Sequence, residues 1–417
     1  MNISHKIELK PNNKTVTYFK KAFGCARFAY NWALAKHKEY YEQGIKKSAY
    51  DLNKEFNAIK REQFPFVLEI SKCVTQQPFL NLDKAFKKFF RDLKRGKLSY
   101  PQFKKKKENR GSFYLSNDVI KVGGKYLKIP KLKNKIKMVE PLRFQGKLNS
   151  VVISYDGNKY YASFSLEIDE NEYRKNRNIK YNEGGIGIDV GLKSFVTLSN
   201  GLQVHFPKEK IKKQEKRIKR LSRQLSKKVH PTTKGDKTKK SNNFIKHSKI
   251  LNKAYKKIRN IRNDFLHKLT SVLVNSYKYI AVEKLNVSGM VKNHKLAKAI
   301  SNVSFYEFRR MLNYKALFNH REVIEADTFY PSSKICSSCG KKKDELSLSD
   351  RVYKCDCGLE LDRDYNASLN LFNLISSVGA VRPELTSVDL TALLIDLQKN
   401  LLITSEVEAE IQQKSYL

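Results

Sequence analysis

Three acidic residues occupy positions that are typical of metal ligands rather than of solvent-exposed side chains. Asp189 lies near the end of the apolar segment 185–190, and Glu283 closes a second apolar segment, 279–283. A single acidic residue at such a position is usually at the end of a strand, with its side chain in solvent. A carboxylate that is buried instead needs a charged partner, hydrogen bonds or a metal. The third candidate, Asp364, also has the alternative role of a helix N-cap. If the three converge, they suit hard cations such as Mg²⁺ or Mn²⁺, and a pair of such ions hydrolyses phosphodiesters.

Four of the six cysteines form two close pairs, which indicates a second kind of metal site. Fifteen residues separate the pairs, and the second pair has one intervening residue where a regular ribbon has two. Four thiolates without an open coordination position fit a structural Zn²⁺. The predicted zinc ligands are Cys336, Cys339, Cys355 and Cys357. Cys25 and Cys73 stand alone and are expected to be small buried hydrophobes.

The charge of the chain predicts a polyanionic partner. The 417 residues hold 83 Lys and Arg against 41 Asp and Glu, a formal net charge of +42. Self-repulsion of this size is relieved by nucleic acid, since each neutralised phosphate releases a counterion. A membrane surface would instead favour one short basic amphipathic helix. With neither a signal-peptide core nor a spanning segment, we expect a cytoplasmic, nucleoid-associated prokaryotic protein without a membrane partner.

The second half of the chain has the element order expected of an RNase H-like domain. Two basic helices lie between its strands, and residues 205–265 hold 22 Lys and Arg against four Asp and Glu. Such a density favours a phosphate track over an ordinary solvated face. The predicted elements are strands 185–190 and 194–198, helices 208–228 and 248–276, strand 279–283, helix 303–318, strand 321–326 and helix 364–378.

The first half combines period-two and helical patterns. Residues 3–9 alternate apolar and polar side chains, and alternating segments return between 113 and 170. We therefore predict a small β-barrel whose first strand is 3–9, interrupted by about one hundred helical residues. The predicted class is a mixed α and β multidomain chain with a barrel, a helical insertion and a nuclease domain that contains a zinc ribbon.

Several motifs resemble those of the TnpB family of transposon-encoded, RNA-guided endonucleases, which are relatives of type V CRISPR effectors. Residues 187–193, Gly-Ile-Asp-Val-Gly-Leu-Lys, resemble the first nuclease motif, 281–285 the second and 362–371 the third. The run 329–340 is similar to the family's approach to its zinc ribbon. The resemblance implies a RuvC-like catalytic site at Asp189, Glu283 and Asp364. It also implies a transposon-derived guide RNA, a double-stranded target DNA and a short target-adjacent motif.

The same resemblance implies a division into domains. The expected parts are a wedge-like barrel at 1–13 and 111–170, a helical recognition insertion at 14–110, a linker at 171–183, a RuvC-like domain at 184–332 and 361–380, a zinc ribbon at 333–360 and an acidic tail at 381–417. A further helix is predicted at about 74–95. In the family, the corresponding helix lies near the duplex that carries the target-adjacent motif, which makes Gln76 and Gln77 candidate DNA contacts. Charge adds further candidate contacts, namely Lys84, Lys87, Lys88, Arg91, Lys104, Lys105, Lys212, Lys216, Arg220, Lys256 and Arg259.

Two other functions use the same residues. A transposase or recombinase joins DNA ends with three such carboxylates, and fold alone does not separate it from a nuclease. A non-cleaving guided repressor typically loses the carboxylates, and all three are present here. We therefore predict a Mg²⁺-dependent, RNA-guided DNA endonuclease that acts as a monomer.

Overall fold

The computed structural model describes residues 1–106, 110–157, 159–175, 184–233, 236–293, 297, 300, 304–347 and 350–377. It divides into two compact units, Met1–Asn176 with Lys228–Lys253, and Arg177–Lys227 with Ala254–Leu417. Of the predicted linker, the first residues belong to helix α4 (Glu170–Lys175), and the remainder lies outside the described residues. The predicted acidic tail also lies outside them.

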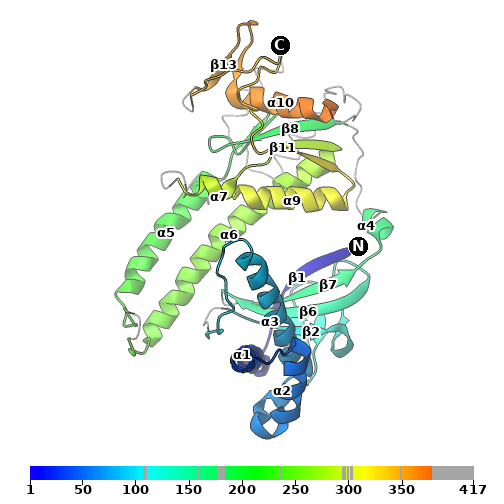
Figure 1. Cartoon of the computed structure of the whole chain (residues 1–417), viewed down its shortest axis with the longest axis vertical. Helices are drawn as coiled ribbons and strands as arrows, with labels where there is room; N and C mark the ends of the chain where they lie inside the picture. The colour runs from blue at the N-terminus through cyan, green and yellow to red at the C-terminus, as the bar shows by residue number, and fades with distance from the viewer. Residues whose placement is uncertain are drawn as a thin grey trace. The chain divides into compact units, whose positions relative to one another are not determined.

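The first unit contains a curled, antiparallel seven-stranded sheet (Figure 1). Its order is β2-β6-β7-β1-β5-β4-β3, with β1 paired along its length to β7. The alternating burial of β1 explains why the pattern at 3–9 predicted it correctly. The small β-barrel predicted from the sequence corresponds to this curled sheet, in which the described strands leave β2 and β3 as two edges. The strands are β1 (Asn2–Lys10), β2 (Arg110–Ser116), β3 (Lys121–Gly123), β4 (Tyr126–Lys128), β5 (Ile136–Met138), β6 (Lys147–Asp156) and β7 (Lys159–Glu167).

Three α-helices and a short 3₁₀ helix come between β1 and β2. They are α1 (Asn13–Glu42), α2 (Ala49–Gln63), η1 (Pro65–Glu69) and α3 (Lys72–Leu93). The side chain of Asn12 caps α1, and Ser48 and Asp51 form a capping box on α2. An aromatic cluster joins the three, with the ring of Phe56 on α2 lying 5.1 Å from Trp32 and 5.5 Å from Phe79. These contacts make the predicted helical insertion a packed bundle.

A five-stranded mixed sheet organises the second unit. The strands are β8 (Gly185–Val190), β9 (Val196–Leu198), β10 (Gln203–Val204), β11 (Tyr279–Glu283) and β12 (Glu322–Ala326), in the order β10-β9-β8-β11-β12. The first three are antiparallel, whereas β8, β11 and β12 run parallel. Helix α10 (Arg363–Ser377) covers one face, where Leu371 and Ile375 pack on Ala281 and Ala326 (Figure 1).

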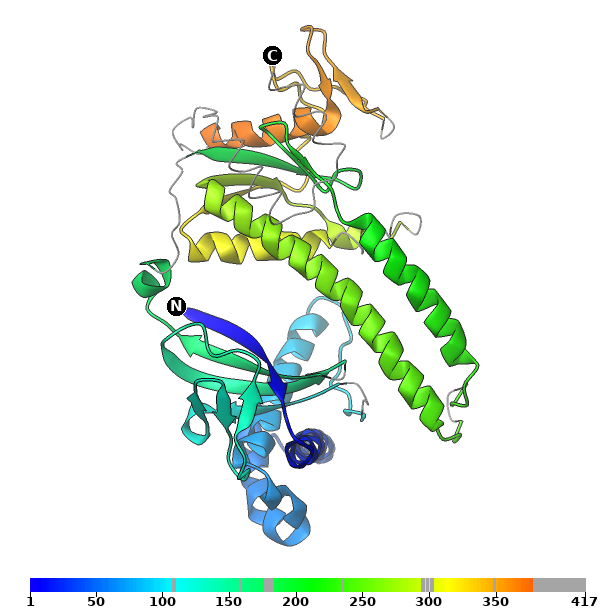
Figure 2. The same ribbon diagram turned by 180° about the vertical axis from the view of Figure 1, so that it is seen from behind.

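Among its described residues, the second unit also contains the helices α5 (Lys208–Ser226), the later part of α6 (Asn242–Ser276), α7 (Val287–Met290) and α9 (Phe305–Phe318). In both views α5 lies beside this part of α6 (Figures 1 and 2). Helix α5 buries Ile211, Ile218 and Leu221, and exposes lysines and arginines on its other faces. None of the helices within the described ranges is long and apolar enough to cross a membrane.

Candidate active site

Two parallel strands bring the first two carboxylates together. The register pairs Ile188 of β8 with Val282 of β11, so the next residues, Asp189 and Glu283, sit side by side at the carboxyl ends of both strands. Asp189 is 8% exposed. The carboxyl ends of adjacent parallel strands are where open α/β sheets commonly place ligands. The apolar runs that predicted these strands therefore also set the spacing of their acids.

The third carboxylate reaches the same place from α10. Asp364 lies in the first turn of this helix with its side chain 17% exposed. An ideal Cβ built on Gly191, just past β8, would be 3.9 Å from Asp364 Oδ2. The N-cap is Asp362, whose Oδ1 accepts the backbone N–H groups of Asp364 and Tyr365, each at 3.0 Å. The cap role that the sequence offered for Asp364 thus belongs to Asp362.

The three acids repel one another in a poorly hydrated place. Burial first, then the charges of Glu283 and Asp364, raise the pKa of Asp189 well above its ordinary value. The nearby guanidinium of Arg363 opposes this shift only in part. Burial also raises the pKa of Glu283, although a hydrogen bond from Ser332 lowers it. Carboxylates that lie close together in a buried place have raised pKa values, and such groups are common at functional sites, including those that bind cations.

Helix α10 approaches the sheet at a glycine. A Cβ added at Gly187 in β8 would lie 2.0 Å from the carbonyl oxygen of Ser368 and 2.4 Å from the backbone nitrogen of Phe372. Real Cβ atoms do not come so close, so only glycine permits this helix–strand distance. Because Asp189 and Asp364 lie on these two elements, Gly187 sets the separation of two of the carboxylates.

We expect Gly187→Ala to destabilise the second unit by about 1–3 kcal/mol, the usual cost of overpacking. It should also weaken divalent-metal binding, because α10 must move away from β8 and carry Asp364 with it. Thermal unfolding and Mn²⁺ titration measure the two effects. Gly123→Ala in β3 is the matched control, since a Cβ there meets nothing within 4 Å. Equal behaviour of the two variants would contradict the role of the close approach.

The four predicted zinc ligands converge in a second cluster. Among the described residues, they are the group whose ligand atoms all lie within 4.8 Å of one another. Cys336 Sγ is 3.6 Å from Cys357 Sγ, and Cys339 Sγ is 3.6 Å from Cys355 Sγ. Tetrahedral Zn–S bonds of about 2.3 Å place sulfurs about 3.8 Å apart, so these thiols fit one Zn²⁺. The short Cys355–Cys357 spacing does not prevent convergence.

The cysteines belong to a small insert. Its strands β13 (Val352–Lys354) and β14 (Glu360–Asp362) form a two-stranded sheet around the fully buried Tyr353. The turn after the first pair ends at Gly340 and that after the second at Gly358, with φ of 76° and 86°. These left-handed positions favour glycine and let the backbone fold back behind the sulfurs.

Two asparagines of α10 and one serine join the insert to the carboxylates, and the sequence interpretation gave none of them a role. Asn370 donates to the carbonyl oxygens of Ser332 and Ile335 at 2.8 and 2.6 Å, and Asn366 donates to Ile335 at 2.7 Å. The hydroxyl of Ser332 donates to Glu283 Oε1. These residues lie within two of the family motifs, which was the only signal available in the sequence.

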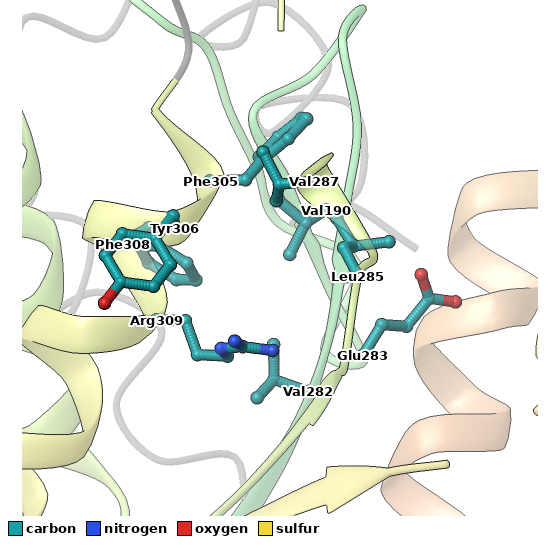
Figure 3. A pocket seen from close by; sticks show the side chains of 9 residues that line it. All are labelled: Val190, Val282, Glu283, Leu285, Val287, Phe305, Tyr306, Phe308 and Arg309. Carbon is teal, nitrogen blue, oxygen red and sulfur yellow. The ribbon is translucent and has the colours of Figure 1, made fainter. Parts of the chain in front are cut away.

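A small cavity beside Glu283 is not where the carboxylate chemistry lies. Figure 3 shows its lining, which is mostly apolar, and the carboxylate of Glu283 points away from it toward α10. The lining residues are Val190, Val282, Glu283, Leu285, Val287, Phe305, Tyr306, Phe308 and Arg309. The carboxylate face of the sheet, on the side of α10, is therefore the candidate active site.

The candidate nucleic-acid contacts lie on helix surfaces of both units. Gln76, Lys84, Lys87, Lys88 and Arg91 are exposed on α3, and Gln77 is half-buried there. Lys212, Lys216 and Arg220 are exposed on α5, whereas on α6 Arg259 is exposed and Lys256 half-buried. Lys104 and Lys105 are both exposed, and Lys104 places its ammonium 3.7 Å from the Tyr30 ring centroid and bonds Asn31 through its backbone. Lys104 is thus held against α1 in this structure.

Known proteins resemble the chain over most of its length. A protein of Streptomyces pristinaespiralis named "Putative RNA-guided DNA endonuclease" is 30% identical over 371 residues, which cover 88% of this chain and 87% of that protein. The chain belongs to the TnpB family. A second relative, "Putative RNA-guided DNA endonuclease InsQ" of Escherichia coli (strain K12), is 28% identical over 88% of this chain and 90% of its own.

Family profiles match three parts of this TnpB-family chain. "Cas12f1-like, TNB domain" matches residues 305–371, "Probable transposase" 163–294 and "Helix-turn-helix domain" 1–46. In the structure the last range holds β1 and the single long helix α1. A solved structure titled "Cryo-EM structure of the Cas12f1-sgRNA-target DNA complex" has a similar fold, with a TM-score of 0.53 at 13% identity over 86% of this chain and 83% of its own.

Proposed function

We propose that the chain is an RNA-guided DNA endonuclease that hydrolyses phosphodiester bonds with two divalent cations at Asp189, Glu283 and Asp364. The observation that carries the proposal is the convergence of these acids from β8, β11 and α10. Two divalent ions held by such carboxylates are the usual arrangement for phosphodiester hydrolysis. The strand order β10-β9-β8-β11-β12 supports an RNase H-like, RuvC-type domain for this site.

The chain's own residues prepare the place for the metal. Asp189 is buried, so its charge is poorly screened and attracts a cation strongly. Ser332 occupies one oxygen of Glu283, and the cap at Asp362 fixes the first turn of α10 that carries Asp364. Asp189, Glu283 and Asp364 would hold Mg²⁺ or Mn²⁺, which would supply the Lewis acidity for phosphodiester hydrolysis. We assign a structural Zn²⁺ to the four cysteines, where it would hold the insert.

The proposed partners are a transposon-derived guide RNA and a double-stranded target DNA next to a short target-adjacent motif. The names of both curated relatives and the net charge of +42 support nucleic-acid partners. In this scheme base pairing reads sequence, while the protein binds shape and backbone. The basic face of α5 suits a phosphate track, and α3 suits a duplex. We propose a monomer that acts in the cytoplasm, at the nucleoid.

Purification from cells that express the native transposon end tests the proposal. We expect a discrete co-purifying RNA that ends in variable flanking sequence. The complex should then cut DNA that matches this RNA, provided that Mg²⁺ is present. DNA joining without RNA would favour a transposase, and stable target binding without cutting would favour a repressor. A chain that carries no RNA and stays well behaved at low salt would contradict the charge argument.

A further inference from the structure

Ser332 makes an unusual long-range contact with a proposed metal ligand. It is 2% exposed, and its hydroxyl donates to Oε1 of Glu283, 49 residues earlier in the chain. A serine hydroxyl on one carboxylate oxygen fixes the side-chain torsions and leaves the other oxygen for a cation. Carboxylates that bind metals are commonly held this way, and loss of such a partner typically costs about 10–100-fold in metal affinity or activity.

The serine is itself held in place by α10. Its backbone N–H donates to the carbonyl of Tyr330 at 2.9 Å, and its own carbonyl accepts from Asn370 at 2.8 Å. The same amide nitrogen reaches Ile335 at 2.6 Å. Buried amides with two acceptors are costly to displace, because both carbonyls would lose their partner. These hydrogen bonds therefore fix the segment that starts at Ser332 in place on α10, the helix that carries Asp364.

The other end of this segment belongs to the cysteine cluster. Asn366, which is fully buried, donates to Ile335 and accepts the backbone N–H of Ser337 at 3.0 Å. Cys336 lies between these two anchored residues and is itself buried. Residues 332–337 thus run from a contact with Glu283 to a zinc ligand, with both ends bonded to α10.

From these contacts we infer that Ser332 is a positioning residue, which orients Glu283 for divalent-metal binding and is held for this task by Asn370 and the cysteine insert. The inference rests on the proposed metal-dependent function. It adds a specific expectation, namely that a residue without metal contact sets the metal affinity of the carboxylate site.

The test compares serine variants in the full chain with its guide RNA. Ser332→Ala should raise the Mn²⁺ dissociation constant and the half-saturating Mg²⁺ concentration for cleavage roughly tenfold. Saturating metal should restore most of the cleavage rate, which would not happen if the variant were merely misfolded. The neighbouring Ser333→Ala, at a half-buried position, is the matched control and should behave as wild type.

A same-size pair keeps the test decisive if alanine disturbs folding. Ser332→Thr retains the hydroxyl and Ser332→Val lacks it. The threonine variant should therefore bind Mn²⁺ roughly tenfold more tightly than the valine variant. Equal metal affinity of threonine and valine, or of Ser332→Ala and wild type, would overturn the inference. Glu283→Gln, with Ser332 unchanged, tests the proposed function separately. If this variant binds Mn²⁺ as tightly as wild type, Glu283 is not a metal ligand, and both the proposed function and the inference are wrong.

Discussion

Asp189→Asn is expected to abolish DNA cleavage, on the order of a thousandfold or more, while the metal-free protein becomes more stable. Cleavage is lost because the amide does not bind a divalent cation as a carboxylate does. Stability rises because burial and the charges of Glu283 and Asp364 disfavour the ionised acid. The neutral amide removes that repulsion and can donate to the remaining carboxylates.

Thermal unfolding with and without Mg²⁺ measures both effects. Without metal the variant should melt roughly a few degrees above wild type. With metal at 100 times its dissociation constant, wild type should gain about 2.7 kcal/mol and the variant much less. RNA binding should be retained, since Asp189 lies in a strand and not on a basic surface. A variant that loses RNA binding would indicate damage to the fold rather than to the catalytic site.

The pH dependence follows from the direction of the pKa shift. Asp189 has a raised pKa in the folded state, so its protonated form favours folding. Its contribution is fully present below the ordinary value of 3.8 and is lost as pH rises through the raised pKa. The advantage of Asp189→Asn over wild type should therefore shrink on acidification. Comparing the two chains cancels the effect of His5, His37 and His267, whose pKa values are lowered by burial and which act in the opposite direction.

Asp236 supplies a control of opposite sign. Its carboxylate accepts the backbone N–H groups of Thr232 and Thr238, and hydrogen bonds from Thr238 and Thr232 lower its pKa to about 2. Asp236→Asn should therefore reduce stability at neutral pH, or leave it unchanged, rather than increase it. If both amide variants changed stability in the same direction, the assigned repulsion at Asp189 would be wrong.

The parts of the site that depend on local pattern were predictable. Strands β8 and β11 begin and end at the predicted residues, because continuous apolar runs are typical of parallel strands covered on both faces. Their acids were visible as exceptions within those runs. The strand at 3–9 was equally clear, since its alternation matches one buried face.

Other features depend on contacts that leave no local pattern. The predicted insertion 14–110 gave no bounds for α2, because this helix buries only Leu52 and Phe56. The predicted alternation began at 113, inside β2, because the strand follows a long basic run. The bond from Ser332 to Glu283 joins residues 49 positions apart, and nothing in the serine's neighbours predicts it. The assignment of the cap to Asp362 instead of Asp364 required the helix start, which sequence fixes only to within a few residues.

Removing two zinc ligands with Cys336→Ser and Cys339→Ser is expected to release one Zn²⁺ per chain and unfold the insert. The insert is too small to fold by burial alone, because β13 and β14 are three residues each and Tyr353 is its one fully buried aromatic ring. Structural zinc contributes about 10–16 kcal/mol of binding free energy in small zinc domains, which exceeds the stability of many whole domains.

The damage should spread from the insert to the second unit. Asn366 and Asn370 would lose the carbonyls that they bind at Ser332 and Ile335, and unpaired buried amides cost about 1–3 kcal/mol each. Metal analysis, limited proteolysis of residues 333–362 and the melting temperature measure the three steps. Cys25→Ala in the first unit is the control, because it removes a buried thiol outside the cluster. It should change the melting temperature little and leave the zinc content unchanged. An unchanged melting temperature in the double variant would refute the zinc assignment, since a tetrahedral site cannot lose two ligands without cost to the fold it holds.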